Sequence, residues 1–137
     1  IDVFQDNDYT KEEMKMLWET QKIMGDQSIL VNATAVRVPV FYGHAEAIHL
    51  ETRSPIDAQH VKELLADAPG VTVYDGNEQF PTQVSSASGN DIVHVGRIRN
   101  DITHPCGLNL WVVSDNIRKG AATNSIQIAE TLIRDYL

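Results

Sequence analysis

The chain has 137 residues, of which 42% are hydrophobic and 22% charged, and it carries a net charge of −8 with an isoelectric point of about 4.9. These values are typical of a soluble globular domain, and the acidic charge argues against a nucleic-acid-binding or anionic-membrane-binding surface. The single cysteine, Cys106, excludes an intrachain disulfide and is compatible with a reducing cytoplasm. No apolar run reaches the ~18–20 residues that span a bilayer.

Residues 6–26 (DNDYTKEEMKMLWETQKIMGD) predict a helix. Thr10 followed three residues later by Glu13 forms a capping box, and Gly25 stands where a C-terminal cap is expected. The predicted apolar face follows helical spacing: Met14, Leu17, Trp18, Gln21 and Met24.

Residues 28–43 and 44–53 are predicted to form two strands, the first of them rich in β-branched residues. Side chains in a strand alternate faces, so Arg37 and His44, seven residues apart, would point to opposite sides of a continuous strand. Between them, Pro39 cannot donate to a sheet ladder and Gly43 permits a bulge or turn. One extra residue in the register would return both groups to the same side.

The second half of the chain alternates helical and strand patterns. Residues 54–70 predict a helix that starts at Ser54 or Asp57, with an apolar stripe of Val61, Leu64 and Leu65. The remaining expected elements are strands at 71–75, 91–101 and 107–116, a loop at 76–90 and a last helix at 118–137. This order indicates an α+β fold with a mixed, mainly antiparallel sheet and helices on one face.

Four polar residues stand out as candidates for a site. Glu12 and Lys15 share a helix face away from the apolar stripe, either as a solvated ion pair or as a site for a zwitterionic or phosphorylated ligand. Arg37, in an apolar strand, is either a structural salt bridge or a bidentate clamp for a carboxylate. His44 is either structural or a proton shuttle.

The last helix adds one more candidate. Asp115 or Asn116 is expected to cap it, and the Asn116 amide could also pair with a ligand amide. Cys106, in THPCGLN, has no nucleophile motif around it, and the remaining histidines show no metal-ligand spacing. The chain has neither a GxGxxG turn nor a P-loop.

Four stretches, in their order and spacing, resemble the C-terminal part of aspartate-semialdehyde dehydrogenase: EEMKMLWETQKIM, AVRVPVFYGHAEA, VGRIRND and GLNLWVVSDNIRKGAATNSIQIAE. The resemblance covers nearly the whole chain. It implies an NADPH-dependent enzyme that reduces L-aspartyl 4-phosphate to aspartate semialdehyde and phosphate, on the way to lysine, threonine, methionine and, in bacteria, diaminopimelate. A cysteine thiolate would attack the acyl phosphate, and hydride from NADPH would release the aldehyde from the resulting thioester.

The same resemblance implies a role for each candidate. Glu12 would bind the substrate amino group, Lys15 the phosphate and Arg37 the α-carboxylate. His44 would be the acid/base, and Asn116 would contact the nicotinamide carboxamide of NADP. Arg37 and His44 would then serve one site.

The family's nucleophile, its glycine-rich cofactor turn and a second phosphate-binding arginine would lie upstream of Ile1. We therefore expect this chain to be a piece of a longer one, inactive by itself and part of a homodimer. Residues 1–117 would belong to the catalytic and dimerisation domain. Residues 118–137 would form a terminal helix that packs on the cofactor-binding domain and, without it, leaves an apolar patch exposed.

Two other functions remain open. The chain could be a non-catalytic α+β module for amino-acid binding or dimerisation. It could also belong to an N-acetylglutamyl phosphate reductase, although an acylated amine would leave Glu12 without an ammonium partner.

Overall fold

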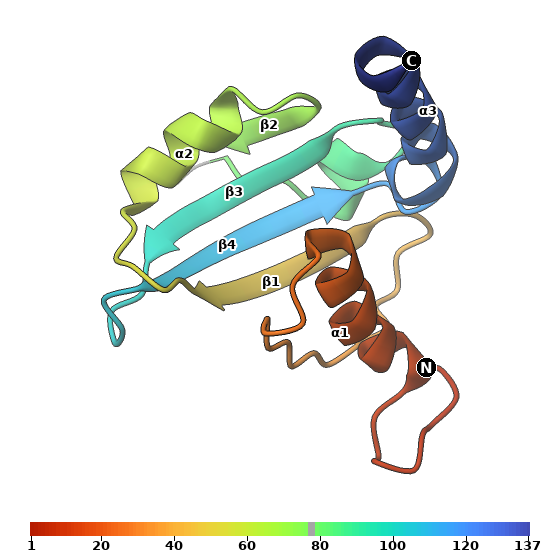
Figure 1. The fold of residues 1–137 in the computed structure, drawn as a ribbon, viewed down its shortest axis with the longest axis horizontal. Helices are drawn as coiled ribbons and strands as arrows, with labels where there is room; N and C mark the ends of the chain where they lie inside the picture. The colour runs from red at the N-terminus through yellow and green to blue at the C-terminus, as the bar shows by residue number, and fades with distance from the viewer. Residues whose placement is uncertain (77–78) are drawn as a thin grey trace. The chain divides into compact units, whose positions relative to one another are not determined.

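A computed structural model describes residues 1–76 and 79–137, which separate into two compact units, Ile1–Pro39 and Val40–Leu137 (Figure 1). Each unit is described by itself. Residues 77 and 78, part of the loop predicted at 76–90, lie outside the described residues. Among the described residues, no helix combines the length and apolar character needed to cross a membrane.

The first unit contains helix α1 (Lys11–Met24), as the sequence predicts. Its capping box is complete, because the hydroxyl of the buried Thr10 accepts from the Glu13 N–H and the Glu13 carboxylate accepts from the Thr10 N–H. At the other end Gly25 adopts a left-handed conformation (φ 66°) and donates back to the last turn.

The strand predicted at residues 28–43 does not form, so this prediction was wrong. β-Branched residues favour strands only where a neighbouring strand satisfies their backbone groups. Here side chains of α1 bind the backbone instead: Ala35 N–H donates to Glu13, and Gln21 donates to the carbonyl of Ile29. Arg37 and His44 therefore share no strand, and the bulge invoked between them is not needed.

The second unit is built on one four-stranded sheet (Figure 1). Its strands are β1 (His44–Glu51), β2 (Val71–Tyr74), β3 (Val93–Asn100) and β4 (Gly107–Ser114), in the order β1-β4-β3-β2. The β1–β4 and β3–β4 pairs are antiparallel and the β2–β3 pair is parallel. The α+β class with a mixed, mainly antiparallel sheet is thus confirmed.

Helix α2 (Ala58–Ala66) covers one face of the sheet. The sequence left its cap open between two residues, and the structure selects Asp57, whose carboxylate accepts from the backbone of Gln59 and His60. The helix ends at Ala66, earlier than predicted, and Leu64 of its expected stripe is exposed. The buried cluster beneath α2 comprises Ala58, Val95, Ile98 and Leu108, with Val61 and Leu65 packed against it.

The opposite face of the sheet is covered by part of the predicted loop. This segment contains a short π-helix, η1 (Gln83–Ala87), capped by the Thr82 hydroxyl. The indole N–H of Trp111 on β4 donates to the carbonyl of Pro81 at 2.9 Å, and Ala87 is fully buried. Residues 81–87 are therefore part of the packed structure, which a composition rich in Ser, Thr and Pro did not indicate.

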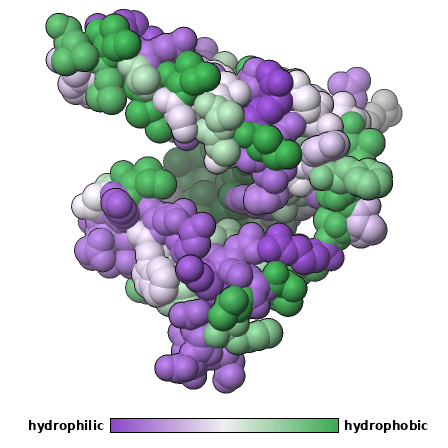
Figure 2. All heavy atoms as spheres, turned by 90° about the vertical axis from the view of Figure 1, so that its right-hand side faces the viewer, coloured by the Kyte–Doolittle hydropathy of each residue, from purple (hydrophilic) through white to green (hydrophobic). Residues whose placement is uncertain are grey.

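The last helix forms in two pieces rather than one. A π-helical turn, η2 (Arg118–Ala122), precedes α3 (Thr123–Tyr136), because Gly120 and Ala122 donate to carbonyls five residues earlier. The small residues of this turn permit the wider backbone path. The predicted apolar side of α3, including Ile126, Ile133 and Tyr136, is exposed. Figure 2 shows hydrophobic side chains on the surface at the top of the view, the level at which Figure 1 places this helix.

Candidate functional site

In the first unit, the structure brings two predicted site residues into contact. The guanidinium of Arg37 donates to the carboxylate of Glu12 and forms an ion pair with it. The Arg37 side chain is 59% exposed and that of Glu12 32%, so a ligand can reach both. Exposed ion pairs contribute only about 0–1 kcal/mol to stability. A ligand that offers Arg37 and Glu12 new charged partners therefore loses little binding free energy in separating the pair.

Glu13 holds the segment that carries Arg37. Its carboxylate accepts one hydrogen bond from Thr10 N–H and another from Ala35 N–H, each at 2.8 Å. These backbone donors, Thr10 first, lower the pKa of Glu13 and keep it ionised. The sequence identifies Glu13 only as part of a cap, and its bond to Ala35 emerges from the fold.

Lys15 is the least constrained of the candidates in this unit. Its ammonium lies 3.6 Å from the Glu19 carboxylate, one helical turn further along, and both side chains are more than half exposed. The simpler interpretation of the sequence paired Lys15 with Glu12, whereas in the structure Lys15 pairs with Glu19 and Glu12 pairs with Arg37. Glu12 and Lys15 lie three residues apart on α1, so the helix places them on neighbouring positions of its surface.

In the second unit, His44 is the first residue of β1 and pairs with Ser114 at the end of β4. Its side chain is exposed at this edge of the ladder. The preceding residue, Gly43, donates its N–H to the side-chain oxygen of Asn116 at 2.9 Å. Two predicted site residues, His44 and Asn116, are thus joined through one peptide.

Asp115 settles the alternative that the sequence left open at the start of the last helix. One carboxylate oxygen accepts from the N–H groups of Ile117 and Arg118, so Asp115 is the residue that caps this turn. Its other oxygen accepts from Gly89 N–H at 2.9 Å, and the residue is only 4% exposed. These donors, Arg118 N–H foremost, lower the pKa of Asp115.

His94 is a buried polar residue that the sequence reading did not single out. It lies on β3 with 5% exposure, and its Nδ1 is 3.3 Å from the Tyr74 hydroxyl. Among the described residues its Nε2 has no hydrogen-bond partner, and burial lowers its pKa. Strand alternation could have indicated that His94 faces away from α2, because its neighbours Val93 and Val95 pack against the core beneath that helix.

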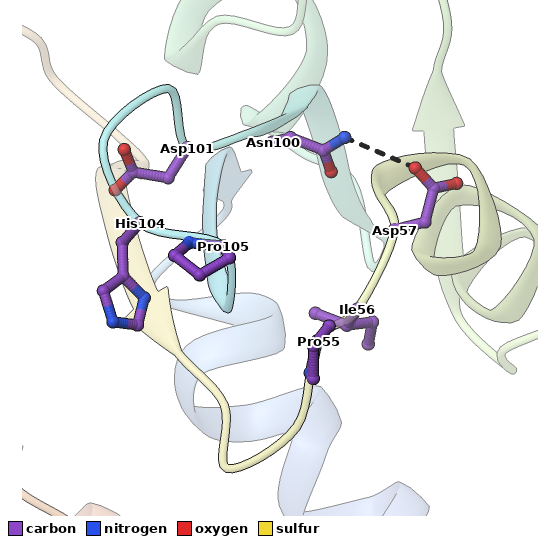
Figure 3. A pocket seen from close by; sticks show the side chains of 7 residues that line it. All are labelled: Pro55, Ile56, Asp57, Asn100, Asp101, His104 and Pro105. Atoms are coloured by element: carbon purple, nitrogen blue, oxygen red, sulfur yellow. Dashed lines mark hydrogen bonds between the residues drawn. The ribbon is translucent and has the colours of Figure 1, made fainter.

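A pocket of about 400 Å³ opens beside the β3–β4 turn (Figure 3). It is lined by residues 55–57, 100–101 and 104–105, and no predicted site residue lines it. The polar groups are engaged with their neighbours: Asn100 donates to Asp57, and Asp101 binds Thr103 and His49. No group of three His, Cys, Asp or Glu side chains in the described part of the chain is placed to hold a metal ion.

Comparison with known proteins identifies the family of the chain. Residues 1–119 match the family described as "Semialdehyde dehydrogenase, dimerisation domain". The aspartate-semialdehyde dehydrogenase of Shewanella sp. (strain DB6705) is 66% identical over 136 residues, covering 99% of this chain and 40% of that protein.

Two solved structures extend the comparison to the fold. The crystal structure of aspartate semialdehyde dehydrogenase II complexed with ASA from Vibrio cholerae superposes with a TM-score of 0.95 at 65% identity, over 100% of this chain and 40% of that one. A probable aspartate-semialdehyde dehydrogenase from Pseudomonas aeruginosa gives 0.90 at 34% identity, over 100% of this chain and 41% of that one. The resemblance seen in the sequence is confirmed, and the chain belongs to the semialdehyde dehydrogenase family, of which it contains the dimerisation domain.

Proposed function

We propose that this chain supplies the substrate-binding and acid/base residues of an NADP-dependent, phosphorylating aspartate-semialdehyde dehydrogenase. The observation that carries the substrate assignment is the ion pair of Glu12 and Arg37. A substrate with an ammonium and a carboxylate on one carbon could replace this pair, with its carboxylate on Arg37 and its ammonium on Glu12. These two charges do not distinguish aspartate derivatives from other amino acids. The choice of an aspartate derivative therefore rests on the names of the relatives.

The first unit would bind the substrate. Arg37 would clamp the α-carboxylate with two parallel N–H donors, and Glu12 would accept hydrogen bonds from the amino group. Lys15, as a compact positive charge, would hold the phosphate. Its bond to Glu19 is long and exposed, so an incoming phosphate dianion competes readily for the ammonium.

The second unit would supply the proton transfers through His44. An exposed imidazole can accept the proton of the attacking thiol, since histidine is the side chain that most often serves as a general acid and base. After the hydride has been transferred, the imidazolium would return this proton to the oxygen of the sulfur-bound carbon. It would take the proton back as the carbonyl re-forms and the carbon–sulfur bond breaks, and the departing thiolate would receive it last. The thiol itself would come from outside residues 1–137, because Cys106, the single cysteine of the sequence, lies at the end of the β1–β4 ladder opposite His44.

NADPH, when bound, supplies the hydride. The residue of this chain that would hold its nicotinamide end is Asn116. The donor chemistry fits: with its oxygen occupied by Gly43 N–H, the amide still offers its NH2 group to a carboxamide.

The assembly and cellular setting follow from the same proposal. The enzyme would be a cytoplasmic homodimer that serves lysine, threonine, methionine and diaminopimelate biosynthesis. The exposed apolar residues of α3 would pack on the cofactor-binding domain, and residues 1–117 would belong to the catalytic and dimerisation domain. The chain spans about 40% of the length of its relatives, so the remaining parts of the active site would lie elsewhere in the enzyme.

The test uses the full-length gene product. Aspartate semialdehyde and NADP⁺ are mixed with it, and NADPH absorbance is followed with and without inorganic phosphate. A phosphate-dependent rise is expected. No rise from soluble, reduced enzyme would overturn the proposal in favour of a binding or dimerisation module. A rise only with N-acetylglutamate semialdehyde would move the enzyme to the related reductase.

A further inference from the structure

Gly43, the residue before His44, is held from two sides. On one side, Gly43 N–H donates to the Asn116 oxygen at 2.9 Å. On the other, η1 closes in: a Cβ added at Gly43 would lie 3.2 Å from the Gln83 Cβ and 3.4 Å from the Ala87 Cβ. Gly43 also has a φ of +90°, which residues other than glycine rarely adopt. The backbone thus has little freedom at the point where β1 begins.

The elements that hold this peptide are themselves fixed by the end of β4. Ser114, the last residue of β4, pairs with His44 in the sheet. The next residue, Asp115, is buried and binds Gly89 N–H, just beyond η1. The one after that is Asn116. Three consecutive residues therefore bind the His44 strand, the η1 segment and the Gly43 peptide.

The orientation of the Asn116 amide follows from its partner. A backbone N–H can only donate, so the atom 2.9 Å away must be the amide oxygen, which accepts. The NH2 group is then what Asn116 offers to a ligand. A donor is complementary to the oxygen of a carboxamide and not to its nitrogen.

From these contacts we infer that Asn116 is a positioning residue for His44, acting through the Gly43 peptide, while its NH2 group binds the carboxamide oxygen of the nicotinamide. This inference rests on the proposed function and deepens it. One side chain would connect the cofactor to the acid/base residue. The amide oxygen of Asn116 would position His44 and its NH2 group would bind the cofactor, and substitutions can test these two roles separately.

Three variants of the full-length enzyme make this separation. Asn116→Asp keeps an oxygen for Gly43 N–H but loses the NH2 donor, and Asn116→Ala loses both. Gly43→Ala keeps the Asn116 amide and disturbs the backbone at residue 43 together with its packing against η1. The readouts are the crystal structure of each variant, NADPH affinity by calorimetry, and kcat at saturating NADP⁺. NADPH is the probe because its nicotinamide ring is uncharged.

We expect both Asn116 variants to weaken NADPH binding roughly 3- to 10-fold, the usual effect of one lost hydrogen bond, and Gly43→Ala to leave it within about twofold. Asn116→Ala and Gly43→Ala should displace His44 and lower kcat by roughly 10²-fold, as misplaced catalytic groups do. Asn116→Asp should leave His44 in place, and its kcat should be well above that of Asn116→Ala.

Equal kcat and equal His44 positions in Asn116→Asp and Asn116→Ala would overturn the positioning role, even if Gly43→Ala fails to fold. Wild-type NADPH affinity in Asn116→Asp would overturn the donor assignment. If the wild-type enzyme shows no turnover while Asn116→Ala alone displaces His44, the proposed function fails and the positioning role stands.

Discussion

Glu13, on the first turn of α1, accepts a hydrogen bond at 2.8 Å from the backbone N–H of Ala35, which lies two residues before Arg37. The same carboxylate caps the helix through Thr10 N–H. Glu12 is the residue before Glu13 in α1, and it pairs with Arg37. One carboxylate therefore joins the two segments whose side chains are proposed to bind the substrate's amino and carboxylate groups.

Glu13→Gln tests this link. Glutamine has one acceptor oxygen for two backbone donors, and its NH2 group opposes the second donor. We expect the KM for aspartate semialdehyde in the full-length enzyme to rise roughly 3- to 10-fold while kcat changes less, because Arg37 loses its fixed position.

Glu63→Gln is the matched control for this change. Glu63 is an exposed carboxylate on α2 that accepts from the side chain of Gln59 in the same helix, the one hydrogen bond of this carboxylate among residues 1–76 and 79–137, and its substitution should leave KM unchanged. A KM for Glu13→Gln equal to that of the control would show that Glu13 serves only as a cap.

Arg37→Lys separates charge from geometry. A lysine keeps the positive charge but cannot form two parallel hydrogen bonds to a carboxylate. We expect the KM for aspartate semialdehyde to rise about 10-fold or more. Arg99→Lys, on β3, should behave like the wild-type enzyme, because Arg99 is exposed and donates to the nearby carbonyl of Arg97. An unchanged KM in Arg37→Lys would remove the clamp from the mechanism.

His44→Ala tests the acid/base role. General acid–base catalysis contributes roughly 10²–10⁴-fold, so we expect kcat to fall by that factor in the full-length enzyme. His60→Ala, an exposed histidine of α2, is the control and should retain wild-type kcat. Equal kcat in His44→Ala and the wild type would exclude His44 as the proton shuttle.

Asp91 predicts how acid destabilises the second unit. Arg118 binds its carboxylate through two hydrogen bonds of 2.8 Å, Thr123 adds a third, and together these bonds lower the pKa of Asp91 from its ordinary 3.8 to about 2. A lowered pKa means stabilisation that is present above pH 4 and is lost as pH falls toward 2.

The measurement is the urea midpoint of unfolding for wild type and Asp91→Asn at several pH values. The wild type should be the more stable at pH 6, and the difference should shrink below pH 4 and disappear near pH 2. Asp6→Asn, at an exposed position, should show no such trend. A difference that stays constant from pH 6 to 2 would contradict the prediction.

Local patterns in the sequence were sufficient for elements whose signals lie within a few residues. The Thr10–Glu13 capping box and Gly25 placed α1 correctly, because caps satisfy backbone groups of the same helix. The β3–β4 hairpin and β1 were also predicted, since their strand-like sequences find partners in the sheet. The family, too, followed from the order of its sequence stretches.

Tertiary structure decided what local patterns cannot determine. Residues 28–43 have the composition of a strand but no partner strand, so side chains of α1 satisfy part of their backbone instead. A π-helical turn forms at Gln83–Ala87 within a segment of loop-like composition, because Ala87 is buried and the neighbouring Pro81 carbonyl binds Trp111 of the sheet.

The candidate residues divide in the same way. Their chemical types, a carboxylate, two cations, an imidazole and an amide, were evident from the sequence and its resemblance. The contact of Glu12 with Arg37, and that of Asn116 with the peptide before His44, join residues 25 and 73 positions apart. Contacts over such separations depend on how the chain packs, which no local pattern encodes.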